Sequence, residues 1–252
     1  MKCLITGASS GIGKDMANYM RNLGYDLYLV SKDKDKLDSS FKDDKHITKI
    51  ALDLSKEINC YKLYDMLKDK DIDILINNAG FGDAGYFTST DISKELNMID
   101  LNIKAYHILT KLFLKLFTER DYGHILNVAS IAGFMPGPFM ATYYATKSYV
   151  LNLSLAISEE LKQSKSKVKI SILCPGPVKT NFNKTANVKF NISSISSKKC
   201  AKIAIEEMFE GRLIIIPSKF IKLGRIASKF LPLNLVMYIN SKIQRKKIYK
   251  NK

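Results

Sequence analysis

The sequence lacks the features of a membrane-spanning or secreted protein. No uninterrupted apolar run in its 252 residues approaches the roughly 18 residues that a bilayer span requires. Met1 and Lys2 lead directly into Cys3–Thr6, a run typical of a strand, so an apolar leader with a cleavage site has no room. We therefore expect a cytoplasmic protein.

The sequence also lacks the spacings that indicate metal sites. It has four cysteines but no C-x-x-C pair, and none of them lies near a histidine at metal-ligand spacing. We expect free thiols in a reducing compartment, structural or surface histidines, and no bound metal. These residues are Cys3, Cys60, Cys174, Cys200, His46, His107 and His124.

Acidic residues are scarce in the C-terminal third of the chain. The formal net charge is +16, and the residues after Glu210 include 11 Lys or Arg but no Asp or Glu. The overall composition, 46% hydrophobic and 25% charged, is ordinary for a globular domain, and the length suffices for one large α/β core. The basic C-terminal segment therefore needs a separate explanation.

Short apolar runs alternate with longer segments of helical spacing along most of the chain. Strands alternating with helices imply right-handed crossovers and a parallel sheet that is covered on both faces. We predict a doubly wound, Rossmann-type α/β domain over residues 1–217, followed by a basic amphipathic extension over residues 218–252. The predicted strands are Lys2–Thr6, Asp26–Ser31, Ile47–Asp53, Ile72–Ile76, His124–Ala129, Lys167–Leu173 and Leu213–Ile216, and the predicted helices include Gly13–Leu23, Glu57–Leu67, Lys94–Phe117 and Ala141–Leu161.

The first predicted strand ends in a glycine-rich turn that opens a helix. Residues 6–13 read TGASSGIG. Glycines let the backbone approach a pyrophosphate closely, and the free N–H groups at a helix start favour an anion. The spacing G-x-x-x-G-x-G resembles that of the short-chain dehydrogenase/reductase family, and the resemblance implies a bound dinucleotide. The implied contacts are Gly7, Ser9, Ser10, Gly11, Ile12 and Gly13.

The end of the second predicted strand favours NADP(H) over NAD(H). An NAD-selective site would usually place an acid there for the adenosine ribose, but this chain has Ser31. Lys32 follows and offers a cation to a 2′-phosphate. Asp33 and Asp35 come next and weaken this preference, and the alternative is that the lysines of this loop are merely solvated.

Three further segments resemble cofactor-binding motifs of the family. Asp53 and Leu54 end the third predicted strand, where the family holds the adenine ring. Residues 77–80 read NNAG, and the resemblance assigns Asn78 and Ala79 to the nucleotide. Residues 174–180 read CPGPVKT, and the resemblance assigns Val178 and Thr180 to the nicotinamide carboxamide.

The catalytic prediction rests on Ser130, Tyr143 and Lys147. The tyrosine and the lysine are four residues apart, so on a helix they share one face, whereas Tyr144 points elsewhere. A nearby ammonium favours the phenolate and should lower the tyrosine pKa, which suits an acid/base. The resemblance implies that Ser130 binds the substrate oxygen, that Lys147 and Tyr143 also contact the cofactor, and that Asn102 anchors a water relay.

The apolar segments suggest a substrate class and an assembly. Ile131–Met140 is strongly apolar, which favours an acyl- or steroid-like carbonyl substrate, although packing in the core explains it equally well. Asn181–Ser197 is the predicted lid. Ala105–Phe117 and Tyr149–Leu161 are apolar on more than one side, which favours a homodimer or homotetramer over burial beneath the C-terminal segment.

The C-terminal extension allows three interpretations. Phe220–Leu231 has an apolar side next to Lys222, Arg225 and Lys229, as in helices at anionic membrane surfaces. The alternatives are a lid or oligomer arm with a solvated basic side, and a nucleic-acid contact, which no motif supports. For the whole chain, the leading hypothesis is an NADP(H)-dependent carbonyl reductase or alcohol dehydrogenase. The alternative is an NADP(H)-binding sensor or membrane-associated scaffold without turnover.

Overall fold

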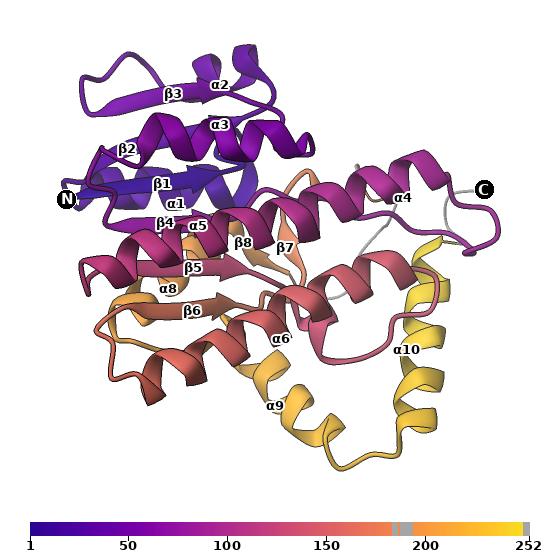
Figure 1. The fold of residues 1–252 in the computed structure, drawn as a ribbon. Helices are drawn as coiled ribbons and strands as arrows, with labels where there is room; N and C mark the ends of the chain where they lie inside the picture. Colours follow the sequence, from indigo (N-terminus) through magenta and orange to yellow (C-terminus); the bar gives the residue numbers. More distant parts are fainter. Residues whose placement is uncertain (183–185, 187–193, 249–252) are drawn as a thin grey trace.

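A computed structural model describes residues 1–182, 186 and 194–248 of the chain. At its centre is a parallel sheet of seven strands in the order β3-β2-β1-β4-β5-β6-β9 (Figure 1). This confirms the predicted doubly wound fold. The strands in that order are β3 (Ile47–Ala51), β2 (Asp26–Ser31), β1 (Lys2–Thr6), β4 (Ile74–Asn77), β5 (His124–Val128), β6 (Lys169–Leu173) and β9 (Ile214–Ile215).

Helices cover both faces of this sheet. Successive residues of β1 point to opposite faces, so Ile5 packs in the cluster under α1 and α8, whereas Leu4 packs in the cluster under α3 and α5. Both faces are buried, which explains the nearly continuous apolar strands. The helices are α1 (Gly11–Asn22), α2 (Lys34–Ser40), α3 (Glu57–Leu67), α4 (Ile92–Ile99), η1 (Asp100–Ala105), α5 (Tyr106–Glu119), η2 (Ile131–Phe134), α6 (Ala141–Gln163), α8 (Ser197–Phe209), α9 (Lys219–Ser228) and α10 (Leu233–Ile248), and a second sheet pairs β7 (Val178–Lys179) with β8 (Ile195–Ser196).

Several element boundaries differ from the sequence predictions. The predicted helix Lys94–Phe117 is divided into α4, a π-helical turn at η1, and α5. The predicted strand Ile72–Ile76 begins two residues later and includes Asn77. The helix α2 was not predicted, because its run of charged and small polar residues shows no apolar periodicity.

The C-terminal helices return to the carboxyl edge of the sheet. After β9 the chain forms α9, turns near Pro232, and forms α10, which lies beside the N-terminal end of α6 (Figure 1). Ile221 of α9 packs against the cluster that contains Val150 and Ile172. The described part of 218–252 thus packs on the main domain, and the proposed boundary at residue 217 stays a prediction. Among the described residues, no helix is long and apolar enough to cross a membrane.

Candidate active site

A large cavity lies at the carboxyl edge of the parallel strands. Its volume is about 1240 Å³, more than most drug-sized ligands need. It extends from the glycine turn after β1 to the C-terminal helices. Of the predicted site residues, those that line it are Gly7, Ser9, Ser10, Gly11, Ile12, Lys32, Asp53, Leu54, Asn78, Ala79, Ser130, Tyr143, Lys147, Val178 and Thr180. Gly13 and Asn102 are not among the lining residues.

The glycine turn is held in a conformation that only glycine permits. Gly7 has φ +67°, and a Cβ there would lie 2.7 Å from the Ala79 Cα. A Cβ on Gly13 would lie 2.4 Å from the Asn78 Nδ2. Gly13 therefore allows the Asn78 side chain to pack closely against the start of α1. At the N-cap of α1, the Ser10 side chain makes no capping hydrogen bond, which leaves the first-turn N–H groups for an anion.

Asn78 joins the turn to the end of β4. Its side-chain amide donates to the carbonyl oxygens of Thr6 (3.0 Å) and Gly7 (3.2 Å). The backbone N–H groups of Asn78 and Ala79 both donate to the Thr6 hydroxyl, at 2.9 and 3.1 Å. Asn77 is buried and donates to Asn127 (3.0 Å), so its side chain braces the sheet. The NNAG motif thus combines three residues that line the cavity with one, Asn77, in the core.

The loop after β2 contributes a hydroxyl and two cations to the cavity. The Ser31 hydroxyl donates to the Ser9 hydroxyl (2.9 Å), which ties this position to the glycine turn. Lys32 is exposed and lines the cavity, as does Lys36, which the sequence reasoning had treated only as part of a solvated loop. The Asp33 carboxylate accepts a hydrogen bond from the Lys36 N–H (2.9 Å) and caps α2. The Asp33 carboxylate is therefore occupied by its hydrogen bond to the N-terminus of α2.

The loop after β3 contributes an apolar side chain, Leu54, to the wall of the cavity. Leu54 is buried and lines the cavity next to Asp53. The Asp53 carboxylate accepts hydrogen bonds from the Ser55 N–H (3.0 Å) and the Ser55 hydroxyl (2.8 Å). These bonds fix the carboxylate within its own loop.

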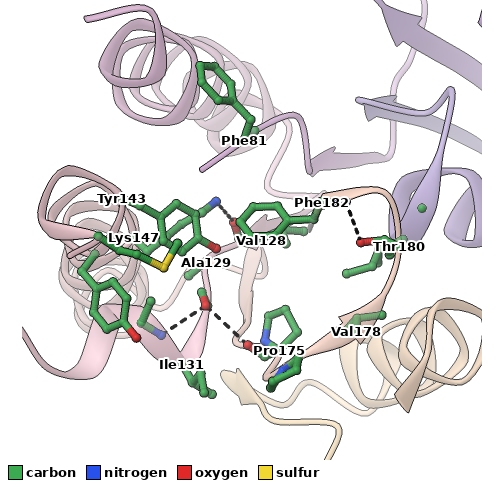
Figure 2. Close-up of a pocket in the computed structure, with 18 of the residues that line it drawn as sticks. Phe81, Val128, Ala129, Ile131, Tyr143, Lys147, Pro175, Val178, Thr180 and Phe182 are labelled. Carbon is green, nitrogen blue, oxygen red and sulfur yellow. Dashed lines mark hydrogen bonds between the residues drawn. The ribbon is translucent and has the colours of Figure 1, made fainter. Parts of the chain in front are cut away.

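Tyr143, Lys147 and Ser130 converge on the cavity from α6 and the loop after β5. Figure 2 shows the Tyr143 and Lys147 side chains next to each other, with a hydrogen bond from Lys147 to Val128. A Cβ on Gly133 would lie 2.7 Å from the Lys147 carbonyl oxygen, so the turn η2 packs directly on α6. This contact holds Ser130, three residues earlier, next to the tyrosine.

Burial dominates the ionisation of this group. It raises the pKa of Tyr143 to about 12, although a hydrogen bond with Ser130 partly offsets the rise. It lowers the pKa of Lys147 to about 8, so the ammonium is still mainly charged at neutral pH. Lys147 Nζ donates to the Val128 carbonyl (2.9 Å) and lies 6.0 Å from the centroid of the Tyr143 ring.

The expectation that Lys147 lowers the tyrosine pKa is therefore wrong for this structure. The ammonium is directed to the Val128 carbonyl instead of the phenol, and burial outweighs the hydrogen bond from Ser130. The one-face placement of Tyr143 and Lys147 does follow from their spacing on α6. The spacing of Tyr143 and Lys147 predicts that they are neighbours on α6, but it does not predict which acceptor the flexible lysine side chain contacts.

Asn102 is fully buried in the π-helical turn η1. Its amide nitrogen donates to the Phe81 carbonyl (2.8 Å) and the Thr146 hydroxyl (3.1 Å), and its oxygen accepts from the Phe81 N–H (3.1 Å). A Cβ on Gly80 would lie 2.8 Å from the Asn102 oxygen and 3.5 Å from Lys147 Nζ. Asn102 thus links the NNAG loop to α6 behind the cavity. Such π-helical turns are frequent at functional sites.

An aromatic and aliphatic wall faces Tyr143. The Phe182 ring lies 5.4 Å from the Tyr143 ring between centroids, and the Phe182 N–H donates to the Thr180 hydroxyl (3.2 Å) (Figure 2). From the predicted wall 131–140, the lining residues are Ile131, Ala132, Phe134, Met135 and Met140. The predicted lid over 181–197 lies mostly outside the described residues.

A contribution of α9 and α10 to the cavity was predicted only as the lid alternative, and no residue of these helices was among the predicted site residues. Asn240 donates to the Pro136 carbonyl (2.7 Å), and Gln244 donates to the Tyr144 hydroxyl. Both amides are buried, at 7% and 3% exposure, and both line the cavity. Two polar residues at helical spacing, Asn240 and Gln244, were the available signal, because they interrupt the apolar side of that helix.

The cysteines and histidines have structural surroundings. All four cysteines are buried free thiols. The His124 ring bonds to the Ser171 hydroxyl (2.9 Å), and His46 lies 2.6 Å from the Asp26 carboxylate. His107 lies 2.7 Å from the Tyr149 hydroxyl. Within the described ranges, no group of His, Cys, Asp or Glu could hold a metal ion.

A family model described as short chain dehydrogenase matches residues 2–191. The chain belongs to the short-chain dehydrogenase/reductase family. This confirms the resemblance seen in the sequence and makes the chain a member of an oxidoreductase family. An uncharacterised oxidoreductase of Staphylococcus aureus is 31% identical over 188 residues, which are 73% of this chain and 80% of the relative.

Other relatives cover this chain unevenly. A very-long-chain 3-oxoacyl-CoA reductase of Neurospora crassa is 35% identical over 169 residues, 63% of this chain and 51% of that protein. The chain thus spans about half the length of this relative. A short-chain dehydrogenase of Sphingobium yanoikuyae in complex with NADPH has a TM-score of 0.82 at 28% identity, covering 90% of this chain and 92% of that one. A bulky-bulky ketone specific alcohol dehydrogenase of Comamonas testosteroni has a TM-score of 0.76 at 26% identity, with the same coverage.

Proposed function

We propose that the protein is an NADP(H)-dependent oxidoreductase that interconverts a ketone or aldehyde and an alcohol. The observation that carries this proposal is the convergence of Ser130, Tyr143 and Lys147 on the same cavity as the glycine turn. The bound nicotinamide dinucleotide would supply or accept the hydride. The chain itself must bind the substrate oxygen and supply or accept its proton.

Tyr143 is the proposed proton donor and acceptor. With a pKa of about 12 it remains protonated at neutral pH, as a donor for carbonyl reduction must be. Ser130 would hold the substrate oxygen against this hydroxyl. Lys147, whose ammonium lies behind the Tyr143 ring, would stabilise negative charge as the phenol loses its proton, and it would also contact the nicotinamide ribose.

Asn102 is the proposed anchor of a proton relay. Its buried amide joins the Phe81 backbone to Thr146 on the helix of Tyr143, and its oxygen lies near the Gly80 backbone next to Lys147. This position is close to the lysine and behind the cavity, where a water chain toward the solvent would pass.

The proposed dinucleotide contacts follow the shape of the turn. The open first turn of α1 and the left-handed Gly7 fit a pyrophosphate, since both bring backbone N–H groups to the cavity surface. The proposed contacts are Gly7, Ser9, Ser10, Gly11, Ile12, Lys32, Asp53, Leu54, Asn78, Ala79, Tyr143, Lys147, Val178 and Thr180, with Gly13 as a packing position.

The preference for NADP(H) rests on the loop after β2. Ser31 stands where an NAD-selective site would have an acid, and Lys32 and Lys36 both line the cavity nearby. Lys32→Ala should weaken NADPH binding at least about tenfold and leave NADH binding nearly unchanged. Lys34→Ala is the control, because Lys34 is exposed and outside the set of lining residues. Equal losses for both cofactors would contradict the assignment.

A hydrophobic, acyl- or steroid-like substrate is proposed from the wall around Tyr143. Phe182, Met135 and Met140 line this part of the cavity, and α9 and α10 add Ile221, Leu231 and Ile239 at its outer end. A relative named very-long-chain 3-oxoacyl-CoA reductase and a neighbour specific for bulky ketones agree with a large apolar substrate.

The test of the proposed reaction is Tyr143→Phe. Removing the hydroxyl should lower kcat for NADPH-dependent ketone reduction by about 10²–10⁴-fold, with NADPH binding retained. Tyr61→Phe is the matched control, because Tyr61 is exposed on α3 and does not line the cavity. Unchanged turnover in Tyr143→Phe would refute the mechanism. NADPH binding by the wild-type protein without turnover of any ketone would favour the sensor or scaffold instead.

A homodimer or homotetramer through α5 and α6 is also proposed. Leu112, Leu114 and Leu116 of α5 remain half-buried, and Tyr149 of α6 is exposed beside His107. Light scattering coupled to size exclusion would measure the assembly. A monomer at micromolar concentration would contradict this proposal.

The outer side of α9 and α10 is proposed to contact an anionic membrane surface. Leu223 and Phe230 are 67% and 83% exposed and do not line the cavity, and the neighbouring Lys222 and Lys229 have no acidic partner in this segment. Flotation with vesicles containing phosphatidylglycerol should show binding that falls with salt, and Phe230→Ser should weaken it. Absence of vesicle binding would favour the oligomer arm.

A further inference from the structure

Arg225 lies inside the cavity, apart from the other basic residues of α9. The lining residues Ile221, Arg225 and Ser228 recur at the spacing of one helix side, whereas Lys222 and Lys229 are exposed and do not line the cavity. The sequence pattern alone predicts Arg225 on a common basic side with those two lysines. Tertiary packing therefore separates one cation from its sequence neighbours.

The position of α9 places Arg225 in the substrate part of the cavity. A Cβ on Gly176 would lie 3.1 Å from the Ile221 side chain, so α9 passes close to the loop after β6. One turn later, the guanidinium carbon of Arg225 lies 4.2 Å from the centroid of the Phe134 ring. Phe134 is four residues after Ser130, in the turn that packs on α6. The guanidinium is thus near the catalytic wall and far along the sheet from the loop of Lys32.

This guanidinium has no counter-charge among the described residues. Its Nε is buried without a hydrogen-bond partner there, and no described carboxylate forms an ion pair with it. Three carboxylates line the cavity. Asp33 and Asp53 follow β2 and β3 at the opposite edge of the sheet, and Asp91 caps α4, where it accepts a hydrogen bond from the Ser93 N–H (2.8 Å). Burial raises the pKa of the neighbouring Cys174 to about 12, so that thiol is uncharged at neutral pH.

Arg225 is half-buried, so its guanidinium loses part of its hydration, and a ligand of opposite charge would compensate for that loss. Stacking on Phe134 recovers part of the lost hydration and also fixes the plane of the guanidinium. A fixed guanidinium presents parallel N–H groups that match a carboxylate or a phosphate. The features of Arg225 are therefore those of an anion subsite.

We propose that Arg225 binds an anionic group of the substrate. The substrate would then be an apolar carbonyl or alcohol compound with a carboxylate or phosphate distant from the reacting carbon. This inference rests on the proposed function, because it names the substrate class of the same cavity. Arg225 acts in it as a specificity-determining residue.

The test compares three probes of equal chain length: an oxo fatty acid, its methyl ester and the corresponding oxoalkyl phosphate. The wild-type protein should have a KM at least about tenfold lower for one anionic probe than for the ester. Arg225→Gln should raise that KM about tenfold or more, and change kcat and the ester KM by less than about twofold. Arg225→Lys should keep part of the preference for the anionic probe, because lysine retains the positive charge but lacks the paired N–H groups of the guanidinium. The better anionic probe identifies the group as carboxylate or phosphate.

Lys222→Gln is the matched control, since it removes a positive charge from the same helix outside the cavity. Equal effects of Arg225→Gln on acid and ester, or no preference in the wild-type protein, would overturn the inference. Calorimetric binding of the same probes to the NADPH-loaded protein separates the two proposals. Charge-dependent binding without turnover would contradict the proposed reaction and leave the anion subsite standing.

Discussion

The attachment of α10 to the cavity depends on two buried amides. Asn240 donates to the Pro136 carbonyl, and Gln244 donates to the Tyr144 hydroxyl and to the Asn240 side chain (3.3 Å). A typical hydrogen bond contributes about 1 kcal/mol net, and two of these three bonds join α10 to the rest of the chain, so Asn240→Ala together with Gln244→Ala should weaken the attachment by about 2 kcal/mol. That corresponds to an increase of about 30-fold in the equilibrium for local opening of α10.

Hydrogen exchange of the α10 amides measures this opening directly. The double variant should exchange about 30-fold faster over residues 233–245, and the KM for an apolar ketone should rise more than kcat falls, because α10 forms a wall of the cavity. Each single variant should give more than half of the total effect, since it loses its own bond and also the bond between the two amides.

Asn234→Ala is the control for the double variant. Asn234 is exposed in the same helix, so its replacement reports only the gain in helix propensity that any Asn to Ala change brings. If the double variant exchanged no faster than Asn234→Ala, the two amides would not hold α10, and the reasoning would be refuted.

Two further predictions concern stability. Gly13→Ala should destabilise the fold by about 1–3 kcal/mol in urea unfolding, since its Cβ would lie 2.4 Å from the Asn78 Nδ2, whereas Gly224→Ala, with nothing within 4 Å, should be neutral or stabilising; equal effects would contradict the packing argument. Burial lowers the pKa of His124 from 6.5 to about 4, so acid favours the unfolded chain, and stability present above pH 6.5 is lost as the pH falls toward 4. Between pH 7.5 and 5 this group should cost about 2 kcal/mol. His124→Gln, which can still bond to Ser171, should remove that part of the pH dependence, and an unchanged dependence would exclude His124 as its source.

The glycine turn and the catalytic pair could be predicted because their geometry is local. The turn joins one strand to the next helix within eight residues, and glycine is required there by the backbone itself. Tyr143 and Lys147 share a side of α6 because four residues make about one helical turn. The doubly wound sheet could be predicted for the same reason, because the periodicity of each strand and helix is visible within a short stretch of sequence.

The remaining features depended on contacts between distant parts of the chain. No local sequence pattern predicts the π-helical turn that buries Asn102, because Asn102 is held by hydrogen bonds to Phe81 and Thr146, which are distant in the sequence. The direction of the Lys147 ammonium was likewise set by the Val128 carbonyl, 19 residues away.

The C-terminal extension shows most clearly the difference between what the local sequence predicts and what tertiary contacts determine. The sequence alone determined that this segment is basic, amphipathic and free of acids after Glu210. Only the tertiary structure decided that Arg225 faces the cavity while Lys222 faces the solvent, and that Gln244 bonds to Tyr144, 100 residues earlier. The physical reason is that helical periodicity fixes which residues share a side, whereas the surface available for packing fixes which side is buried.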